Sequence, residues 1–379
     1  MKDFLRRVAA LIVGSVFLFI FSVIALFTRP KKFRGSLSKP RVWYRLPVPG
    51  VVGSDGKPLP LYAKRGEGED LVVFFAGGGA AWNAETAARP MSVWSMLTGA
   101  EAYYFPKIYH ILEGMFTGAL SPKDSKNPFV GWNMFYLPYA TGDFHMGDTE
   151  MPYTSLKGQE KIMFFKGASN SRIGLERAKQ LFPNVKRLFI MGDSAGAFGC
   201  AAMTPLVASF WPEAESVYVY SDGSQISAAY WREVVRDIWK APAEICEELG
   251  REGELYVDLL RYADKAMNGR AVFLRSNTAI DDVLTRFQNK MRHDKYGLDD
   301  MAIREFREGL SRSERLLEQS GISYYPFITA HNKNKKIGTT QHTMIRNSNS
   351  FYSEADAGIS LAEWLGNAAD GKFQSVTCI

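Results

Sequence analysis

A short apolar run that leads through a glycine-flanked serine into a run of small residues constrains the fold of this chain most strongly. Residues 187–191 are followed by Gly192-Asp193-Ser194-Ala195-Gly196 and then by mostly small residues to about position 207. This order predicts a buried strand, a tight turn and a helix packed closely against a sheet. A Gly-x-Ser-x-Gly pentapeptide in that context is typical of a nucleophile elbow, which exposes the serine hydroxyl at the turn. Ser194 is therefore a candidate nucleophile, and a glycine-rich turn without a catalytic role is the alternative.

Apolar segments of strand length alternate with segments of helical spacing along the chain. We expect strands at residues 43–49, 59–64, 70–76, within 127–139, and at 161–166, 187–191, 216–221, 271–275 and 322–330. We expect helices at residues 170–181, 197–207, 225–240, 244–267, 299–319 and 359–365. This alternation predicts an α/β fold of the α/β-hydrolase type, with a mainly parallel sheet and helices on both faces.

The N-terminal segment differs from the rest of the chain. Residues 8–27 carry no charge, and as a helix they span about 30 Å, the thickness of a bilayer core. They end in bulky residues rather than a small-residue cleavage site, which favours an uncleaved transmembrane helix over a signal peptide. Residues 1–34 account for the whole net charge of +6, so the basic excess indicates a membrane surface rather than a nucleic acid as partner.

We therefore expect a membrane anchor over residues 1–34 and a single catalytic domain over residues 35–379. Positive charge flanks both ends of the apolar run, and the charge rule alone leaves the domain cytoplasmic. An export anchor instead places it in the periplasm or outside the cell, which is the location we expect.

A second glycine-rich turn, Gly77-Gly78-Gly79, follows the expected strand at residues 70–76. In α/β-hydrolases, a loop at this position supplies backbone N–H groups to the oxyanion hole. A phosphate-binding loop is the alternative, but no Lys-Ser/Thr pair follows the glycines. The three cysteines form neither a disulfide framework nor a CxxC metal pair, so we expect no metal or other cofactor.

A catalytic serine needs a base and a group that orients the base, in the chain order Ser, Asp or Glu, His. Asp222 and Asp281 each follow an expected strand, and His331 and His342 follow the last one. From position alone, either aspartate serves as the acid and either histidine as the base.

Six blocks, among them the two glycine-rich turns, are informative together. They are Gly77-Gly78-Gly79-Ala80-Ala81-Trp82, Trp132-Asn133 with Tyr139-x-Thr141-Gly142-Asp143-x-x-x-Gly147-Asp148, the Ser194 pentapeptide, Ser221-Asp222-Gly223, residues 273–281 and residues 338–345. In sequence and order they resemble the pectin acetylesterase and Notum carboxylesterase family, with an ending similar to its bacterial members. Ala76 and Ala81 depart from the pattern, because the family has an acidic residue and a cysteine there.

The resemblance implies a serine carboxylesterase in which Ser194 is the nucleophile, Asp281 the acid and His342 the base, ahead of Asp222 and His331. It also implies an oxyanion hole formed by the N–H groups of Gly78, Gly79 and Ala195. The expected substrate is an ester, first an O-acetyl group on a polysaccharide. Aromatic and polar residues of the same blocks are candidates for substrate binding: Trp82, Trp132 and Asp143. A lipase or thioesterase for longer acyl chains and a non-catalytic binding protein are the alternatives.

Overall fold

The computed structural model describes residues 28–109, 116–250, 252–330, 333, 338–355 and 358–378. No helix in these ranges is long and apolar enough to cross a membrane. The expected transmembrane helix at residues 8–27 lies outside the described residues, and so does His331.

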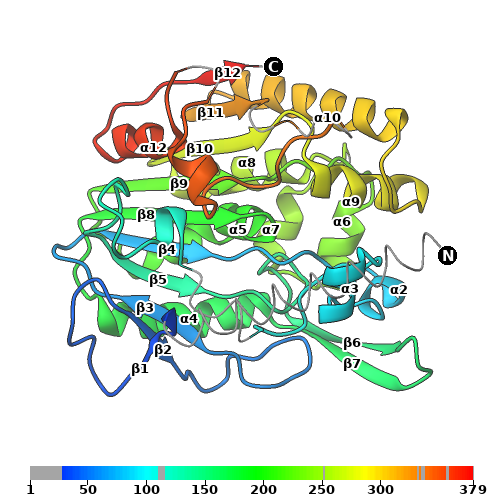
Figure 1. Cartoon of the computed structure of the whole chain (residues 1–379), viewed down its shortest axis with the longest axis horizontal. Coiled ribbons are helices and arrows are strands. Elements are labelled where there is room, and N and C mark those ends of the chain that lie inside the picture. The colour runs from blue at the N-terminus through cyan, green and yellow to red at the C-terminus, as the bar shows by residue number, and fades with distance from the viewer. Residues whose placement is uncertain are drawn as a thin grey trace.

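The described strands form one ten-stranded sheet and a separate two-stranded hairpin (Figure 1). The large sheet has the order β1 (Lys31–Lys32), β2 (Trp43–Leu46), β3 (Leu61–Lys64), β5 (Asn133–Leu137), β4 (Leu71–Phe75), β8 (Arg187–Asp193), β9 (Ser216–Asp222), β10 (Ala271–Thr278), β11 (Tyr324–Thr329) and β12 (Val376–Cys378). Only β3 runs against its neighbours, and every other adjacent pair of this sheet is parallel. The protein is thus a mixed α/β fold with a largely parallel sheet, as the sequence predicts.

Helices of very different lengths alternate with these strands. They are α2 (Ala84–Ala87), α3 (Val93–Thr98), α4 (Gly167–Leu181), α5 (Ala195–Phe210), α6 (Trp231–Glu233), α7 (Ala243–Glu248), α8 (Leu255–Met267), α9 (Asp282–His293), α10 (Asp300–Glu318), α11 (Ser348–Tyr352) and α12 (Leu361–Ala369), with single turns η1 (Gly118–Leu120) and η2 (Val234–Ile238). The region expected as two helices over residues 225–267 is broken into α6, η2, α7 and α8, because Pro242 precedes α7 and Gly253 has φ +75°.

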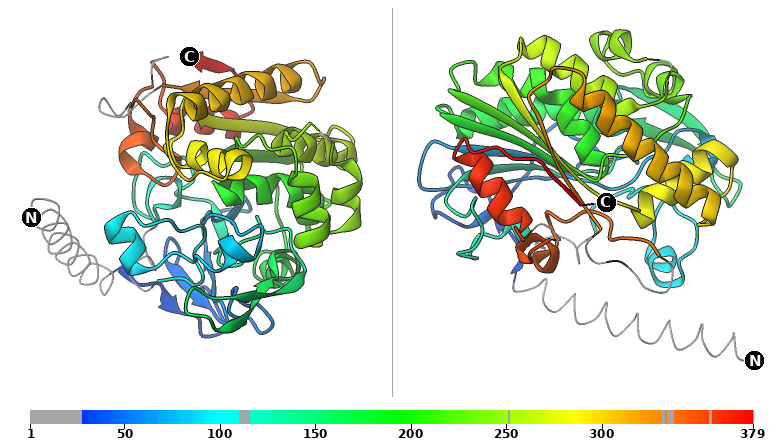
Figure 2. Two further views of the ribbon diagram at one scale, coloured as in Figure 1. Left: turned by 90° about the vertical axis from the view of Figure 1, so that its right-hand side faces the viewer. Right: turned by 90° about the horizontal axis from the view of Figure 1, so that it is seen from above.

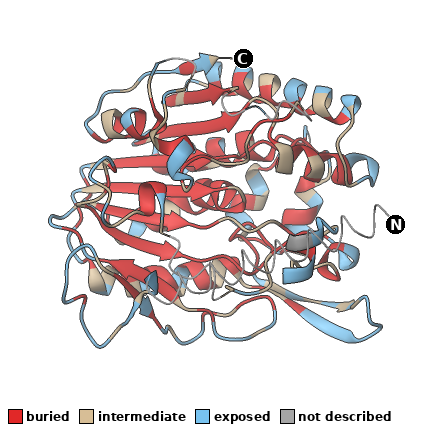
Figure 3. Ribbon diagram, in the orientation of Figure 1, coloured by how far each residue is buried: buried red, intermediate tan, exposed pale blue. Residues whose placement is uncertain are grey.

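Both faces of the central strands are covered, as Figure 2 shows from above and Figure 3 shows by burial. Side chains alternate between faces along a strand, and β9 illustrates this. The Ser221 hydroxyl donates to the Ala197 carbonyl of α5 at 2.9 Å, whereas the Tyr220 ring meets Trp364 of α12 on the other face. Strand β4 is buried along its whole length, which is typical of a parallel sheet between two helical layers.

The expected strand at residues 161–166 lies elsewhere. It forms β7 (Glu160–Phe165), which pairs with β6 (Thr149–Thr154) in an antiparallel hairpin beside the large sheet. The alternating burial of β6 shows that one face of this hairpin is open to solvent. The sequence of a short apolar segment therefore predicts that the segment is a strand, but not to which sheet the strand belongs.

One buried ion pair connects the sheet to α10. The Arg275 side chain on β10 is fully buried and donates to Glu314 Oε1 at 2.8 Å. It also donates to the Ser224 hydroxyl at 3.0 Å and to Gln225 Oε1 at 2.8 Å, and it stacks over the Tyr256 ring. Arg275 thus holds β10, α10 and the turn after β9 in one arrangement.

Replacing Arg275 by Met is expected to lower the free energy of unfolding by about 3–5 kcal/mol, because Glu314 would remain buried without its partner. Chemical denaturation of purified protein measures this. The control is Lys186→Met, which removes an exposed pair with Glu69 and should change the free energy by less than about 1 kcal/mol. Equal effects of the two substitutions would contradict the assignment.

Candidate active site

Ser194 lies in a tight turn between β8 and α5 with φ 54° and ψ −122°. A non-glycine residue in such a conformation is strained by about 1–3 kcal/mol and needs support from its surroundings. A Cβ atom on Gly192 would lie 2.0 Å from the Gly196 carbonyl oxygen, and one on Gly196 would lie 2.0 Å from the Phe75 carbonyl oxygen. The turn therefore requires glycine on both sides of the serine, as the pentapeptide predicts.

The Gly77–Gly79 loop leaves β4 beside this turn. A Cβ atom on Gly77 would lie 2.7 Å from the Ser194 Cβ atom, so the loop and the elbow are in close contact. Among the described residues, the N–H groups of Gly78, Gly79 and Ala195 have no hydrogen-bond acceptor. All three residues line the same pocket as Ser194. Unpaired backbone donors beside a serine are the arrangement that stabilises an oxyanion.

His342 lies after β11 and forms a hydrogen bond with Asp281. The distance between His342 Nδ1 and Asp281 Oδ2 is 2.7 Å, and Asp281 is buried. The other carboxylate oxygen of Asp281 accepts the N–H groups of Val283 and Leu284 at the start of α9. These contacts orient the carboxylate, which in turn orients the imidazole so that Nε2 is left for a second partner.

Two opposing effects set the pKa of His342. Burial of the imidazole disfavours its charged form and lowers the pKa. The charge and hydrogen bond of Asp281 raise the pKa, and the charges of Asp222 and Asp193 add smaller increases. Together these increases exceed the decrease caused by burial. The pKa of His342 is therefore above its usual value, and the acidic surroundings stabilise the protonated imidazole.

Ser194 and His342 line one pocket with a volume of about 290 Å³. Its polar lining also includes Thr343, Asp193 and Arg346. Most of the other lining side chains are apolar or aromatic: Met91, Tyr103, Phe105, Phe144, Phe198, Ile226, Val283, Leu284 and Phe287. An apolar cavity with a few polar groups at one place is the usual form of a small-molecule site.

The alternative acid, Asp222, has other partners than the imidazole. Its Oδ1 atom accepts the Ser276 hydroxyl at 2.7 Å, and its Oδ2 atom accepts the N–H groups of Met344 and Ile345 at 2.6 and 2.8 Å. The structure thus brings Asp281, and not Asp222, into hydrogen-bond contact with His342.

Trp82, Trp132 and Asp143, which the sequence suggests for substrate binding, do not belong to the lining of this pocket. The Trp82 ring is buried behind Phe287, and the Trp132 ring lies under the Arg187 guanidinium. Asp143 is fully buried and accepts hydrogen bonds from Thr141 and His145 of its own loop and from the Gly167 N–H group at the start of α4. Each of these three side chains contacts other residues of the fold and does not line the pocket.

Two pocket residues, Asp193 and Arg346, are not predicted as site residues from the sequence. Asp193 accepts the Gly77 N–H at 2.9 Å and lies 3.6 Å from the Arg346 guanidinium. The pair therefore connects the elbow, the glycine loop and the segment after His342. Asp193 stands inside the pentapeptide and Arg346 four residues beyond His342, so proximity in sequence to the two motifs is the signal that could have found them.

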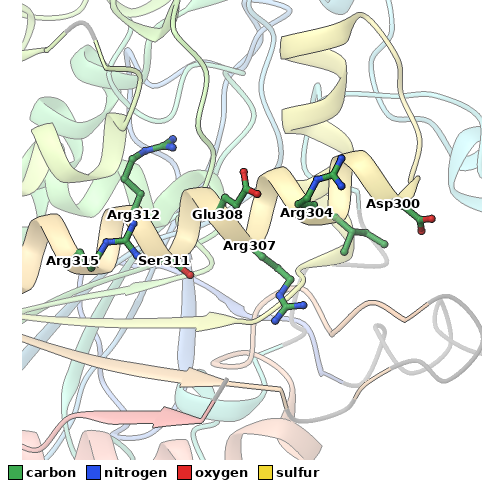
Figure 4. A pocket seen from close by; sticks show the side chains of 8 residues that line it. Asp300, Arg304, Arg307, Glu308, Ser311, Arg312 and Arg315 are labelled. Carbon is green, nitrogen blue, oxygen red and sulfur yellow. The ribbon is translucent and has the colours of Figure 1, made fainter.

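A second hollow, of about 630 Å³, lies along the exposed side of α10 (Figure 4). Its charged side chains are of both signs: Asp300, Arg304, Arg307, Glu308, Arg312 and Arg315. One helix supplies the whole lining, and no histidine belongs to it. This hollow therefore contains no serine–histidine pair. No group of three or more metal-ligating side chains occurs among the described residues either.

Residues 46–227 match the family model described as pectinacetylesterase, and no curated protein matches the chain. The matched range contains the Gly77–Gly79 loop, the Ser194 elbow and Asp222, and ends before Asp281 and His342. Such a family implies a carboxylic ester hydrolase that acts on acetyl esters. Over this segment, which is a little under half of the chain, the protein is similar to the pectinacetylesterase family.

Proposed function

We propose that the chain is a serine carboxylesterase that removes O-acetyl groups from a polysaccharide through Ser194, His342 and Asp281. The single observation that carries the proposal is the convergence of the strained serine, the Asp281-bound imidazole and unpaired backbone donors on one pocket. These are the three parts that acyl transfer through a serine needs.

In this mechanism, His342 Nε2 accepts the hydroxyl proton while Ser194 Oγ attacks the ester carbonyl carbon. The N–H groups of Gly78, Gly79 and Ala195 donate to the oxyanion that forms, each contributing about 2.7–4 kcal/mol. The protonated imidazole then gives its proton to the departing alcohol oxygen, which leaves an acyl-serine. Water, deprotonated by His342, hydrolyses that ester and regenerates the serine.

A second candidate function is the hydrolysis of longer acyl esters. The apolar lining of the pocket favours it, because an acetyl group would contact only a small part of the aromatic and aliphatic surface.

We also propose that residues 1–34 attach the protein to a membrane and leave the catalytic domain in the periplasm or outside the cell. The uncharged run at residues 8–27 and the basic residues around it support this.

Replacing Ser194 by Ala should reduce kcat for p-nitrophenyl acetate by about 10⁶-fold, because the nucleophile is lost while the fold is kept. The matched control is Ser209→Ala, at the exposed end of the helix α5 that follows Ser194. This substitution should leave kcat unchanged. A fluorophosphonate probe should label Ser194 of the unaltered protein and fail to label the variant. Absent labelling of folded, unaltered protein would instead support a non-catalytic binding protein.

The pH dependence of kcat/KM should show an acid limb with a midpoint above 6.5, the usual pKa of histidine. His342 accepts a proton only when neutral, and Asp281 raises its pKa. In Asp281→Asn, the acid limb should move to lower pH, and kcat should fall by about 10⁴-fold, because the amide no longer favours the required tautomer. An acid limb that stays in place would show that Asp281 does not interact with the base.

A series of p-nitrophenyl esters from acetate to octanoate separates the two candidate substrates. We expect the acetyl ester to have the highest kcat/KM. If the apolar pocket instead binds the acyl chain, kcat/KM should rise by about fourfold per added CH₂ group, from about 0.8 kcal/mol of burial. Phe287→Ala should flatten such a rise and leave acetate hydrolysis nearly unchanged.

A further inference from the structure

We propose that Asp222 is a positioning residue. Its buried carboxylate holds residues 342–345, here called the His342 loop, against the Ser194 elbow. The role rests on the proposed function, because it concerns the relative placement of the base and the nucleophile.

Asp222 contacts both halves of the site at once. Its carbonyl oxygen accepts the N–H group of Ser194 at 2.7 Å. Its Oδ2 atom accepts the N–H groups of Met344 and Ile345, which follow His342 closely in the chain. One residue at the end of β9 therefore binds the backbone of the nucleophile and the backbone beside the base.

The His342 loop needs such support because it contains strain. Thr343 has φ +53°, a conformation that is strained for a non-glycine residue and persists only when neighbours maintain it. The two N–H groups directly after Thr343 are those bound by Asp222. On the other side, a Cβ atom on Gly223 would lie 3.0 Å from Thr343 Cγ2 and 3.4 Å from His342 Cε1. The turn after β9 thus packs directly against the imidazole and its neighbour.

The carboxylate also contributes charge. Asp222 is buried, and burial, opposed by its hydrogen bonds, raises its pKa to about 6. Its negative charge, like those of Asp281 and Asp193, raises the pKa of His342. The cation lining the same pocket, Arg346, is paired with Asp193. Loss of the Asp222 charge should therefore lower the pKa of the base.

Two substitutions at this position separate placement from charge. Asp222→Ala removes the acceptor of both N–H groups and should lower kcat for p-nitrophenyl acetate by about 100-fold or more, with KM within about threefold. Asp222→Asn keeps an amide oxygen for the two N–H groups, while its NH₂ group donates to the Ser276 hydroxyl. It should return kcat to within about tenfold of the unaltered protein, with the acid limb of the pH profile at lower pH.

The control is Ser276→Ala, which removes a hydrogen bond to Asp222 but keeps the carboxylate on both N–H groups. It should stay within about threefold in kcat. The proposal is overturned if Asp222→Ala stays within tenfold of the unaltered protein, or if Asp222→Asn is no more active than Asp222→Ala.

Hydrogen exchange reports on the contact without any measurement of activity. In the unaltered protein, the Met344 and Ile345 amides should be strongly protected, and in Asp222→Asn they should remain so. Rapid exchange of both amides in the unaltered protein would refute the proposal, even if Asp222→Ala does not fold. Full activity in Ser194→Ala would refute the proposed function instead, so the two failures are distinguishable.

Discussion

The close approach of three backbone segments at Ser194 is the constraint on which the site depends. The segments are strand β8, helix α5 and the end of β4. A Cβ atom on Gly192 would lie 2.0 Å from the Gly196 carbonyl oxygen, and one on Gly196 would lie 2.0 Å from the Phe75 carbonyl oxygen. Only glycine at positions 192 and 196 permits that distance, and only that distance lets the strained serine turn form. The Gly77–Gly79 loop reaches Ser194 because it leaves β4 at the same point.

The sequence predicts this part well because its determinants are local. The strand, the glycines and the small residues of α5 are consecutive in the chain, and the elbow needs all of them in one order. The choice between Asp222 and Asp281 is different, since Asp222 ends one buried strand, Asp281 follows another, and both are buried. What separates them is the loop after β11, which brings His342 to one carboxylate and the Met344 N–H group to the other. No local pattern encodes that long-range choice.

Aromatic residues mark the other limit of prediction from the sequence. Trp82 and Trp132 belong to recognisable blocks, but a large ring gains free energy from burial anywhere in a core. The pocket is instead lined by rings such as Phe144, which has φ +51° and stacks on Phe198 of α5 at 4.5 Å. The composition of a segment therefore predicts that aromatic side chains are buried, and not which of them face a cavity.

Three buried aspartates, each at the end of a strand of the large sheet or in the segment that follows one, are stabilised in the same way but have different final partners. Asp143, Asp222 and Asp281 each accept backbone N–H groups from a loop or helix start, which offsets the free energy of burying a carboxylate. Burial, opposed by these hydrogen bonds, raises the pKa of Asp143 to about 7 and that of Asp222 to about 6. Asp281 alone among the three directs its second oxygen to an imidazole. The same residue type thus supports loops at two positions and orients an imidazole at the third, and the identity of the last hydrogen-bond partner makes the difference.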